Sequence, residues 1–241
     1  MWILGIETIG MAGSVALMRI PDELPIVGET IDQSVWCEDL QADLRSAQTL
    51  APAMRALFDK AGCQPRDIGL VAVCVGPGSF TGLRVGVGTA KTFAYAVGAQ
   101  AVGIDTLDVL AHQVDLDVGE SVSCILNAQR GELFVARYAY GIDCLEPCRI
   151  VSIDQWLAGL REGEHVIGPP LEKLSGKLPA GVRVAPPERW QPHASTVVRL
   201  GVATWLAKPA GVSFNPFELL PKYIRRVAAE EQWELRCPSS T

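Results

Sequence analysis

The fold is decided by the stretch Gly76-Pro77-Gly78-Ser79-Phe80-Thr81-Gly82, a glycine-rich turn that leads into a long predicted helix. From Gly82 onward every fourth residue is small, at Gly82, Gly86, Ala90, Ala94 and Gly98. Residues four apart lie on one side of a helix, so this side permits another backbone to approach unusually closely. The spacing predicts a helix that is built for packing rather than for side-chain chemistry.

The remaining circumference of this helix is also largely apolar, and such a helix is covered on more than one side. The chain's own sheet supplies one cover, and we expect a second subunit to supply the other. An ordinary internal layer is the alternative that the pattern leaves open. A second predicted helix, 44–62, has a comparable apolar edge. The predicted partner interface consists of Leu50, Met54, Leu57, Phe58, Gly82, Gly86, Ala90 and Ala94. On this hypothesis Gly86→Leu breaks pairing and leaves the monomer folded.

The hydrophobic pattern outside these helices predicts a mixed α/β fold in two lobes, 1–104 and 105–241, with the tail of the second a candidate to return to the first. Each lobe opens on a predicted hairpin, with strands 2–8 and 14–19 in the first and 121–127 and 133–140 in the second. Further strands are expected at 30–36, 70–75 and 101–104, and further helices at 107–114, 153–160, 171–177 and 193–207. Strands that alternate with helices over 70–114 indicate parallel pairing.

Composition narrows the function classes. The chain has 241 residues, of which 49% are hydrophobic, and a formal net charge of −6. This charge disfavours a surface devoted to gripping a phosphate backbone, so we expect any role with RNA to be indirect. The sequence predicts no membrane span and no basic leader, and seven scattered cysteines suit a reducing compartment. We therefore expect a cytoplasmic protein.

The glycine-rich motif invites a phosphate-binding interpretation, because a helix N-terminus presents free N–H groups. Its spacing fails both known patterns. A P-loop needs Lys and then Ser or Thr after its last glycine, where this chain has Leu83 and Arg84, and the dinucleotide pattern needs glycine where Thr81 stands. The structural interpretation is a tight turn with Ser79 or Thr81 as helix cap. Arg84 is a surface charge, a carboxylate anchor or a partner contact.

Other candidate sites are sparse. Glu7 and Thr8, after the first strand, form an acidic and hydroxyl pair that could be a vestigial ligand site. The histidines lie apart in the sequence, and Cys144 and Cys148 lack a second ligand pair, so no metal site is predicted. A basic stretch near the end is a candidate for direct RNA binding, with a solvated face as the simpler interpretation; it comprises Lys222, Arg225 and Arg226.

The segment from Val75 to Gly88 closely resembles the bacterial TsaB (YeaZ) family, and the resemblance extends over most of the chain. It includes the opening strand Ile3 to Thr8, Gly103 to Leu107, Asn127 to Phe134 and Pro221 to Arg225. Family members usually carry Asp at the position of Glu7, His near Ser46, and Asp-Ala-Arg in place of Asn127-Ala128-Gln129. These departures weaken any residual ligand binding and leave the fold assignment intact.

The resemblance implies a two-lobed fold of the actin, hexokinase and Hsp70 type and a non-catalytic role in threonylcarbamoylation of the adenosine beside the tRNA anticodon. The implied partner is TsaD, with the ATPase TsaE joining the complex and self-association when TsaD is absent. It implies no cofactor on this chain, with ATP and metal on the partner subunits. The alternative is an enzyme of the same fold, a small-molecule kinase or a metallopeptidase, for which the residues supply neither a phosphate loop nor clustered ligands.

Overall fold

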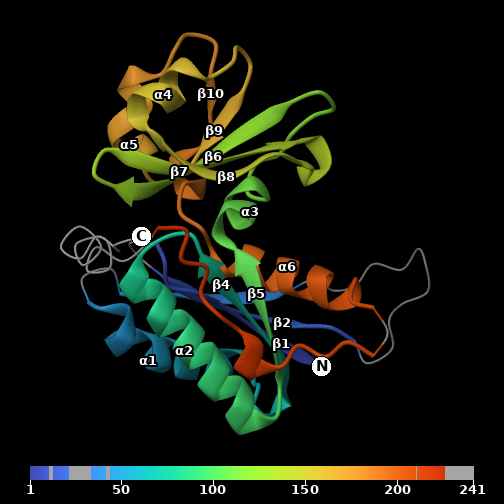
Figure 1. The fold of residues 1–241 in the computed structure, drawn as a ribbon. Helices are drawn as coiled ribbons and strands as arrows, with labels where there is room; N and C mark the ends of the chain where they lie inside the picture. Colours follow the sequence, from blue (N-terminus) through green and yellow to red (C-terminus); the bar gives the residue numbers. More distant parts are fainter. Residues whose placement is uncertain (11–12, 22–33, 42–43, 210, 226–241) are drawn as a thin grey trace, which may run out of the picture.

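The computed structural model describes residues 1–10, 13–21, 34–41, 44–209 and 211–225. Two lobes are stacked one above the other, each around a five-stranded mixed sheet (Figure 1). The expected two-lobed α/β fold, with mixed sheets flanked by helices, is therefore confirmed. In the described part of the chain, none of the helices combines the length and the apolar character that a membrane crossing requires.

The first lobe is built on a sheet with the strand order β3-β2-β1-β4-β5. Its strands are β1 (Trp2–Glu7), β2 (Ser14–Arg19), β3 (Val35–Asp39), β4 (Ile68–Gly76) and β5 (Gln100–Asp105). β1 and β2 form the predicted antiparallel hairpin, and β4 and β5 run parallel as predicted. β1 also runs parallel to β4, a pairing that the sequence did not predict. The unbroken apolar run of β4 is explained by its central place, because both faces of this sheet are covered by helices.

Helices lie on both faces of the first sheet (Figure 1). α1 (Ser46–Ala61) and α2 (Phe80–Val97) share a core with one face of the sheet, through side chains such as Ile6 and Val73. α6 (Ala194–Leu206) covers the opposite face, against residues such as Ile3 and Cys74. α1 ends at Gly62 and α2 at Gly98, both in the left-handed conformation that glycine adopts readily.

The second lobe has the strand order β10-β9-β6-β7-β8. Its strands are β6 (Ser121–Gln129), β7 (Glu132–Ala139), β8 (Cys144–Ser152), β9 (His165–Ile167) and β10 (Arg183–Val184). Its helices are α4 (Ile153–Ala158) and α5 (Leu171–Leu174). Short 3-10 turns occur in both lobes, at Pro65–Asp67, Tyr140–Ile142, Ser175–Lys177, Pro187–Arg189 and Pro216–Glu218. The predicted hairpin of β6 and β7 forms the centre of this lobe.

Between the lobes lies α3 (Thr106–Ala111), which contributes Val109 to the core under α6 and Leu107 to the core of the second lobe. α6 and the C-terminal strap, which we define as residues Phe214–Arg225, pack on the first lobe. The chain therefore lies on the first lobe again from residue 194 onward, a return that the sequence left open for the tail. The second sheet spans only β6 to β10.

Two strand predictions need correction. The strand expected at 30–36 begins at Val35, and residues 30–33 lie outside the described residues. The long strand β8 was not predicted, because it is the outermost strand of its sheet and its side chains alternate irregularly between exposed and half-buried. It contains Pro147, which a central strand would exclude.

Candidate functional site

The glycine-rich motif follows β4 and begins α2. Gly76 and Pro77 are joined by a cis peptide bond, and Ser79 caps the helix by accepting a hydrogen bond from the Gly82 backbone N–H at 3.3 Å. The predicted capping role of Ser79 is therefore confirmed. Phe80 is half-buried and Thr81 is exposed at the first turn of α2.

The small residues of α2 face the chain's own sheet. A side chain at Gly82 would collide with the backbone carbonyl of Thr8, and one at Gly86 would collide with the Thr8 hydroxyl. Ala90 and Ala94 are fully buried in the core that α1 and α2 share with the sheet. The close approach that the spacing predicts is real, and the partner is the end of β1.

The predicted partner interface is wrong in its residues. All eight are buried within the chain: Leu50, Met54, Leu57, Phe58, Gly82, Gly86, Ala90 and Ala94. The apolar edge of α1 packs on the same core, where the Phe58 ring stacks on Phe93 with 5.9 Å between ring centroids. The internal layer, which the sequence left as the alternative, is therefore correct for these side chains.

Glu7 and Thr8 lie directly beneath this motif. The Thr8 hydroxyl donates to the Gly82 carbonyl oxygen at 2.8 Å. Glu7 is fully buried, and its Oε1 accepts hydrogen bonds from the backbone N–H groups of Ile9 and Gly10. Its Oε2 meets no hydrogen-bond partner among the described residues. Burial raises the pKa of Glu7 to about 7, against the lowering effect of the two backbone hydrogen bonds.

This arrangement does not fit a phosphate group or a metal ion. The hydroxyl is committed to α2 and the carboxyl group is fully buried, while Gly78 packs against the side chain of Ile9. Thr8 thus ties the end of β1 to α2, and Glu7 accepts from the turn that follows β1.

Arg84 contacts the chain's own C-terminus. Its guanidinium carbon lies 4.0 Å from the centre of the Phe80 ring, and its Nε donates to the Tyr223 hydroxyl at 3.3 Å. The rings of Phe80 and Tyr223 pack with 5.1 Å between centroids. Arg84 is exposed, which agrees with the interpretation as a surface charge. Its contacts with Phe80 and Tyr223 also hold the C-terminal strap, which the sequence did not predict.

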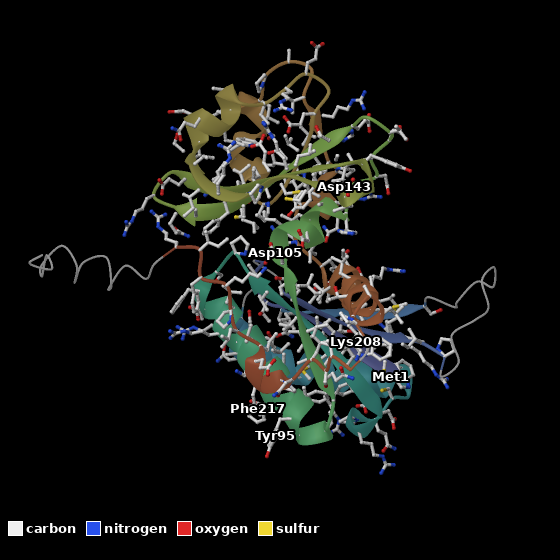
Figure 2. All side chains as sticks on the ribbon, turned by 45° about the vertical axis from the view of Figure 1, so that its right-hand side comes forward. Met1, Tyr95, Asp105, Asp143, Lys208 and Phe217 are labelled. Atoms are coloured by element: carbon white, nitrogen blue, oxygen red, sulfur yellow. The ribbon has the colours of Figure 1, made fainter. Side chains whose placement is uncertain are left out.

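The strap follows the motif closely. The Lys222 backbone N–H donates to the Val75 carbonyl oxygen at 2.7 Å, and the Lys222 side chain pairs with Asp105 at 3.3 Å. At the far end of α2, Phe217 packs on Tyr95 with 5.2 Å between ring centroids (Figure 2). Leu219 is buried in the core of the first lobe. The strap is therefore part of the folded first lobe.

The predicted basic stretch is largely engaged in these contacts. Lys222 is paired with Asp105, and Arg225 is paired with Glu132 at 2.8 Å. Arg226 lies outside the described residues. A nucleic-acid site needs charges that are free to meet phosphate, so these two pairs count against direct tRNA binding by this stretch.

The other predicted candidates do not converge either. His193 stands at the N-terminal cap of α6, where its Nδ1 accepts a hydrogen bond from the Ser195 N–H. Cys144 and Cys148 lie on β8 without further ligands. Across the described ranges, no three His, Cys, Asp or Glu side chains come together in a way that could hold a metal ion. A pocket of about 250 Å³ lies in the second lobe, between β7, β8 and α4; its lining includes Arg137 and Trp156.

The exposed side of α1 and α2 was not predicted as a site, because the prediction was based on the small residues at four-residue spacing within α2, and these are buried. Gly88 lies in the middle of α2, is exposed, and a side chain there would meet open space. Glycine in a helix interior costs about 1 kcal/mol relative to alanine, and no described residue requires it here. Four and eight residues farther along the same side of α2, Thr92 and Ala96 are also small and exposed. The sequence signal that could have indicated this exposed side is Gly88, which falls outside the four-residue spacing of the buried small residues.

Comparison with known proteins identifies the family. A family model described as TsaD, tRNA N6-adenosine threonylcarbamoyltransferase, matches residues 41–164, more than half of the chain. A Bacillus subtilis protein named tRNA threonylcarbamoyladenosine biosynthesis protein TsaB is 27% identical over 97% of this chain and 98% of its own length. The chain belongs to the TsaB/YeaZ family.

Two further TsaB/YeaZ proteins agree with this assignment. TsaB from Escherichia coli is 30% identical over 57% of this chain and 55% of its own length. The structure of YeaZ from Pseudomonas aeruginosa superposes with a TM-score of 0.72 at 20% identity, over 92% of this chain and 99% of that one. The match to YeaZ bears on the fold and extends over both lobes. The family that the motif resembled in the sequence is thus the family to which the chain belongs.

Proposed function

We propose that this protein is a non-catalytic subunit of the machinery that makes threonylcarbamoyladenosine in tRNA, and that it acts by pairing with TsaD. The observation that carries the proposal is the match to Bacillus subtilis TsaB over nearly the whole length of both chains. The proposal assigns the protein to the cytoplasm.

The proposed docking surface is the exposed side of α1 and α2, which we call the helix-pair face. Its small exposed residues are Ala47, Ala51 and Ala56 on α1 and Thr81, Gly88, Thr92 and Ala96 on α2, and the exposed side of α1 also carries the ion pair of Arg55 and Asp59. Small side chains let a second helix pair approach closely, as the buried stripe of α2 lets the end of β1 approach. A stable interface buries roughly 800 Å² on each partner. Gly88 is the strongest single feature, because its cost in helix stability has no internal compensation.

The remaining components of the reaction are proposed to lie on other subunits. Thr8 and Glu7 are engaged with α2 and with their own turn, so ATP and metal are assigned to TsaD and to the ATPase TsaE. Lys222 and Arg225 are neutralised within the chain, so tRNA is assigned to a surface formed mainly by the partner. This chain then contributes a folded face that stabilises or activates TsaD.

The test of pairing uses one glycine substitution and a matched control. Gly88→Leu places a large side chain on the helix-pair face, and Gly176→Leu places one at an equally open glycine in the second lobe. With TsaD from the same source, size exclusion with light scattering gives the mass of each complex. We expect the sum of both chains for the wild type and for Gly176→Leu. Overpacking of a tight contact costs about 1 to 3 kcal/mol, so Gly88→Leu weakens pairing about tenfold or more.

Three outcomes count against the proposal. Separate species for the wild type, or a homodimer that persists in the presence of TsaD, overturn pairing with TsaD. Equal pairing by both leucine variants overturns the helix-pair face as the docking surface. Stoichiometric binding of magnesium ATP by the isolated chain, measured by calorimetry, overturns the non-catalytic role. Modification of tRNA by TsaD and TsaE, followed by nucleoside mass spectrometry, is expected to fall to background when this chain is omitted.

A further inference from the structure

The two lobes are joined at one hinge. The chain crosses between them through α3 and again just before α6, and Gln113 ties these crossings together. Its side-chain amide donates to the carbonyl oxygens of Arg189 and Gln191 at 2.7 and 2.8 Å and accepts from the His193 N–H at 3.0 Å. Two adjacent crossings define one hinge, and a second lobe held only there is free to rotate about it.

The contact of the hinge with the second lobe lies at one end of the central hairpin. The Tyr138 hydroxyl, near the end of β7, donates to the Asp108 carboxylate of α3 at 2.6 Å. Tyr138 pairs with Val122 at the start of β6. The turn between β6 and β7 is six residues away along β7, which is about 20 Å in a strand.

The C-terminal strap reaches the other end of this hairpin. After following α2 to the boundary between the lobes, it ends at Arg225 (Figure 1). The Arg225 guanidinium donates to the carbonyl oxygens of Ala128 and Gln129, and to Glu132 Oε2 at 2.8 Å. These acceptors surround the tight turn of Arg130 and Gly131, whose backbone is left-handed at both residues. A guanidinium offers several donors in a fixed plane, which suits this set of acceptors.

The first-lobe end of the strap is firmly anchored. Leu219 is buried in the core, the Lys222 N–H bonds to Val75, and Tyr223 is held by Phe80 and Arg84. Arg225 is two residues beyond Tyr223, so its position is fixed relative to α2. It therefore links the first lobe to a point on the second lobe that lies well away from the hinge.

We propose that Arg225 is a clasp that fixes the angle between the two lobes by holding the β6–β7 turn against the strap. With the clasp in place, rotation about the hinge breaks the guanidinium hydrogen bonds. Without it, the second lobe loses this restraint and keeps those of α3 and the adjacent crossing. The proposal concerns the isolated chain and does not depend on pairing with TsaD.

The test compares Arg225→Ala with Arg149→Ala. Arg149 also forms an ion pair with a glutamate of the second lobe, Glu146 at 2.9 Å, but both residues lie within that lobe. Hydrogen exchange at residues 127–132 is expected to accelerate about tenfold or more in Arg225→Ala, because charge-assisted hydrogen bonds are lost, and to stay at the wild-type rate in Arg149→Ala. Spin labels on non-cysteine amino acids at Ala56 and Leu145 report the distance between the lobes. We expect its distribution to broaden only in Arg225→Ala.

Two results overturn the clasp. One is unchanged exchange in the turn of Arg225→Ala. The other is faster exchange in the turn with an unchanged distance distribution, which assigns Arg225 to bracing the hairpin alone. Arg225→Met keeps much of the side-chain length and removes every guanidinium donor, and circular dichroism checks that both variants fold. If Arg225→Ala fails to fold, Arg225→Met decides: a broadened distribution supports the clasp, and a wild-type distribution overturns it.

Discussion

The hydroxyl of Thr8 donates a hydrogen bond to the carbonyl oxygen of Gly82, with 2.8 Å between the two oxygen atoms. This contact ties the end of β1 to the first turn of α2, and Gly82 and Gly86 provide the space for it. The small residues of α2 are therefore needed for the monomer to fold.

The first prediction concerns this packing. Gly86→Leu is expected to destabilise the monomer by about 3 kcal/mol or more, because its side chain collides with Thr8 in a filled core. Urea unfolding followed by circular dichroism measures the loss. Gly88→Leu, two residues along the same helix but facing solvent, serves as the control. A Gly86→Leu monomer as stable as the wild type would show that α2 does not pack as described.

The second prediction is that Gly88→Ala stabilises the isolated chain. Alanine removes the helix penalty of glycine, worth about 1 kcal/mol, and meets no neighbouring atom. For a chain of this size the gain raises Tm by about 2 to 4 °C. Scanning calorimetry on the wild type and the variant checks this value. A lower Tm would mean that the exposed side of α2 is packed in the isolated chain.

The third prediction follows from the buried carboxyl group of Glu7. Its pKa is raised to about 7 in the fold from an ordinary value of 4.5, so the folded state favours the protonated form. The associated stability is full below pH 4.5 and is lost as pH rises through 7. The shift corresponds to about 3 kcal/mol. Glu7→Gln keeps an acceptor for the two backbone N–H groups and removes the titration.

The free energy of unfolding of the wild type, relative to Glu7→Gln, should therefore fall by about this amount between pH 4.5 and 7 and stay level above pH 8. Urea titrations of both proteins at half-unit pH steps measure the difference. Curves that run parallel across this range would contradict a raised pKa at Glu7.

The fourth prediction concerns the buried ion pair of the second lobe. Arg137 Nε lies 2.8 Å from Glu164 Oε1, and the two side chains are only 7% and 1% exposed. Arg137→Met leaves Glu164 buried without its partner, which costs about 3 to 5 kcal/mol. Arg149, which is exposed and pairs with the half-buried Glu146, is the control, and Arg149→Ala should cost less than about 1 kcal/mol. Equal losses in the two variants would contradict the burial of this pair.

Much of the fold follows from local pattern. The hairpin of β1 and β2, the apolar strand β4, and α1 and α2 with their terminal glycines are all legible in the sequence, because each has a clear period and a distinct end. The sequence raises a return of the tail to the first lobe but does not show that the return begins at α6, since residues 121–184 separate this helix from that lobe and its apolar face suits either sheet. β8 lacks alternation and so lacks a signal.

In the candidate site, too, some features follow from the local sequence pattern and others depend on the tertiary structure. The four-residue spacing in α2 correctly indicates close packing, but spacing alone does not say whether the neighbour is Thr8 or another protein. That distinction depends on where β1 ends relative to α2, which is a tertiary fact. The contact of Arg84 with Tyr223 joins residues 139 positions apart and likewise has no local signature.

The carbonyl oxygen of Phe214 accepts a hydrogen bond from the Ala101 N–H on β5, at 3.0 Å. β5 ends the first sheet on that side, and its outward backbone groups would otherwise be a template for a strand from another molecule. The C-terminal strap thus covers part of the exposed edge of β5, in addition to fixing the angle between the lobes. A chain shortened before Phe214 would uncover this border and recruit further copies by strand addition, so truncation would cause aggregation through the first lobe.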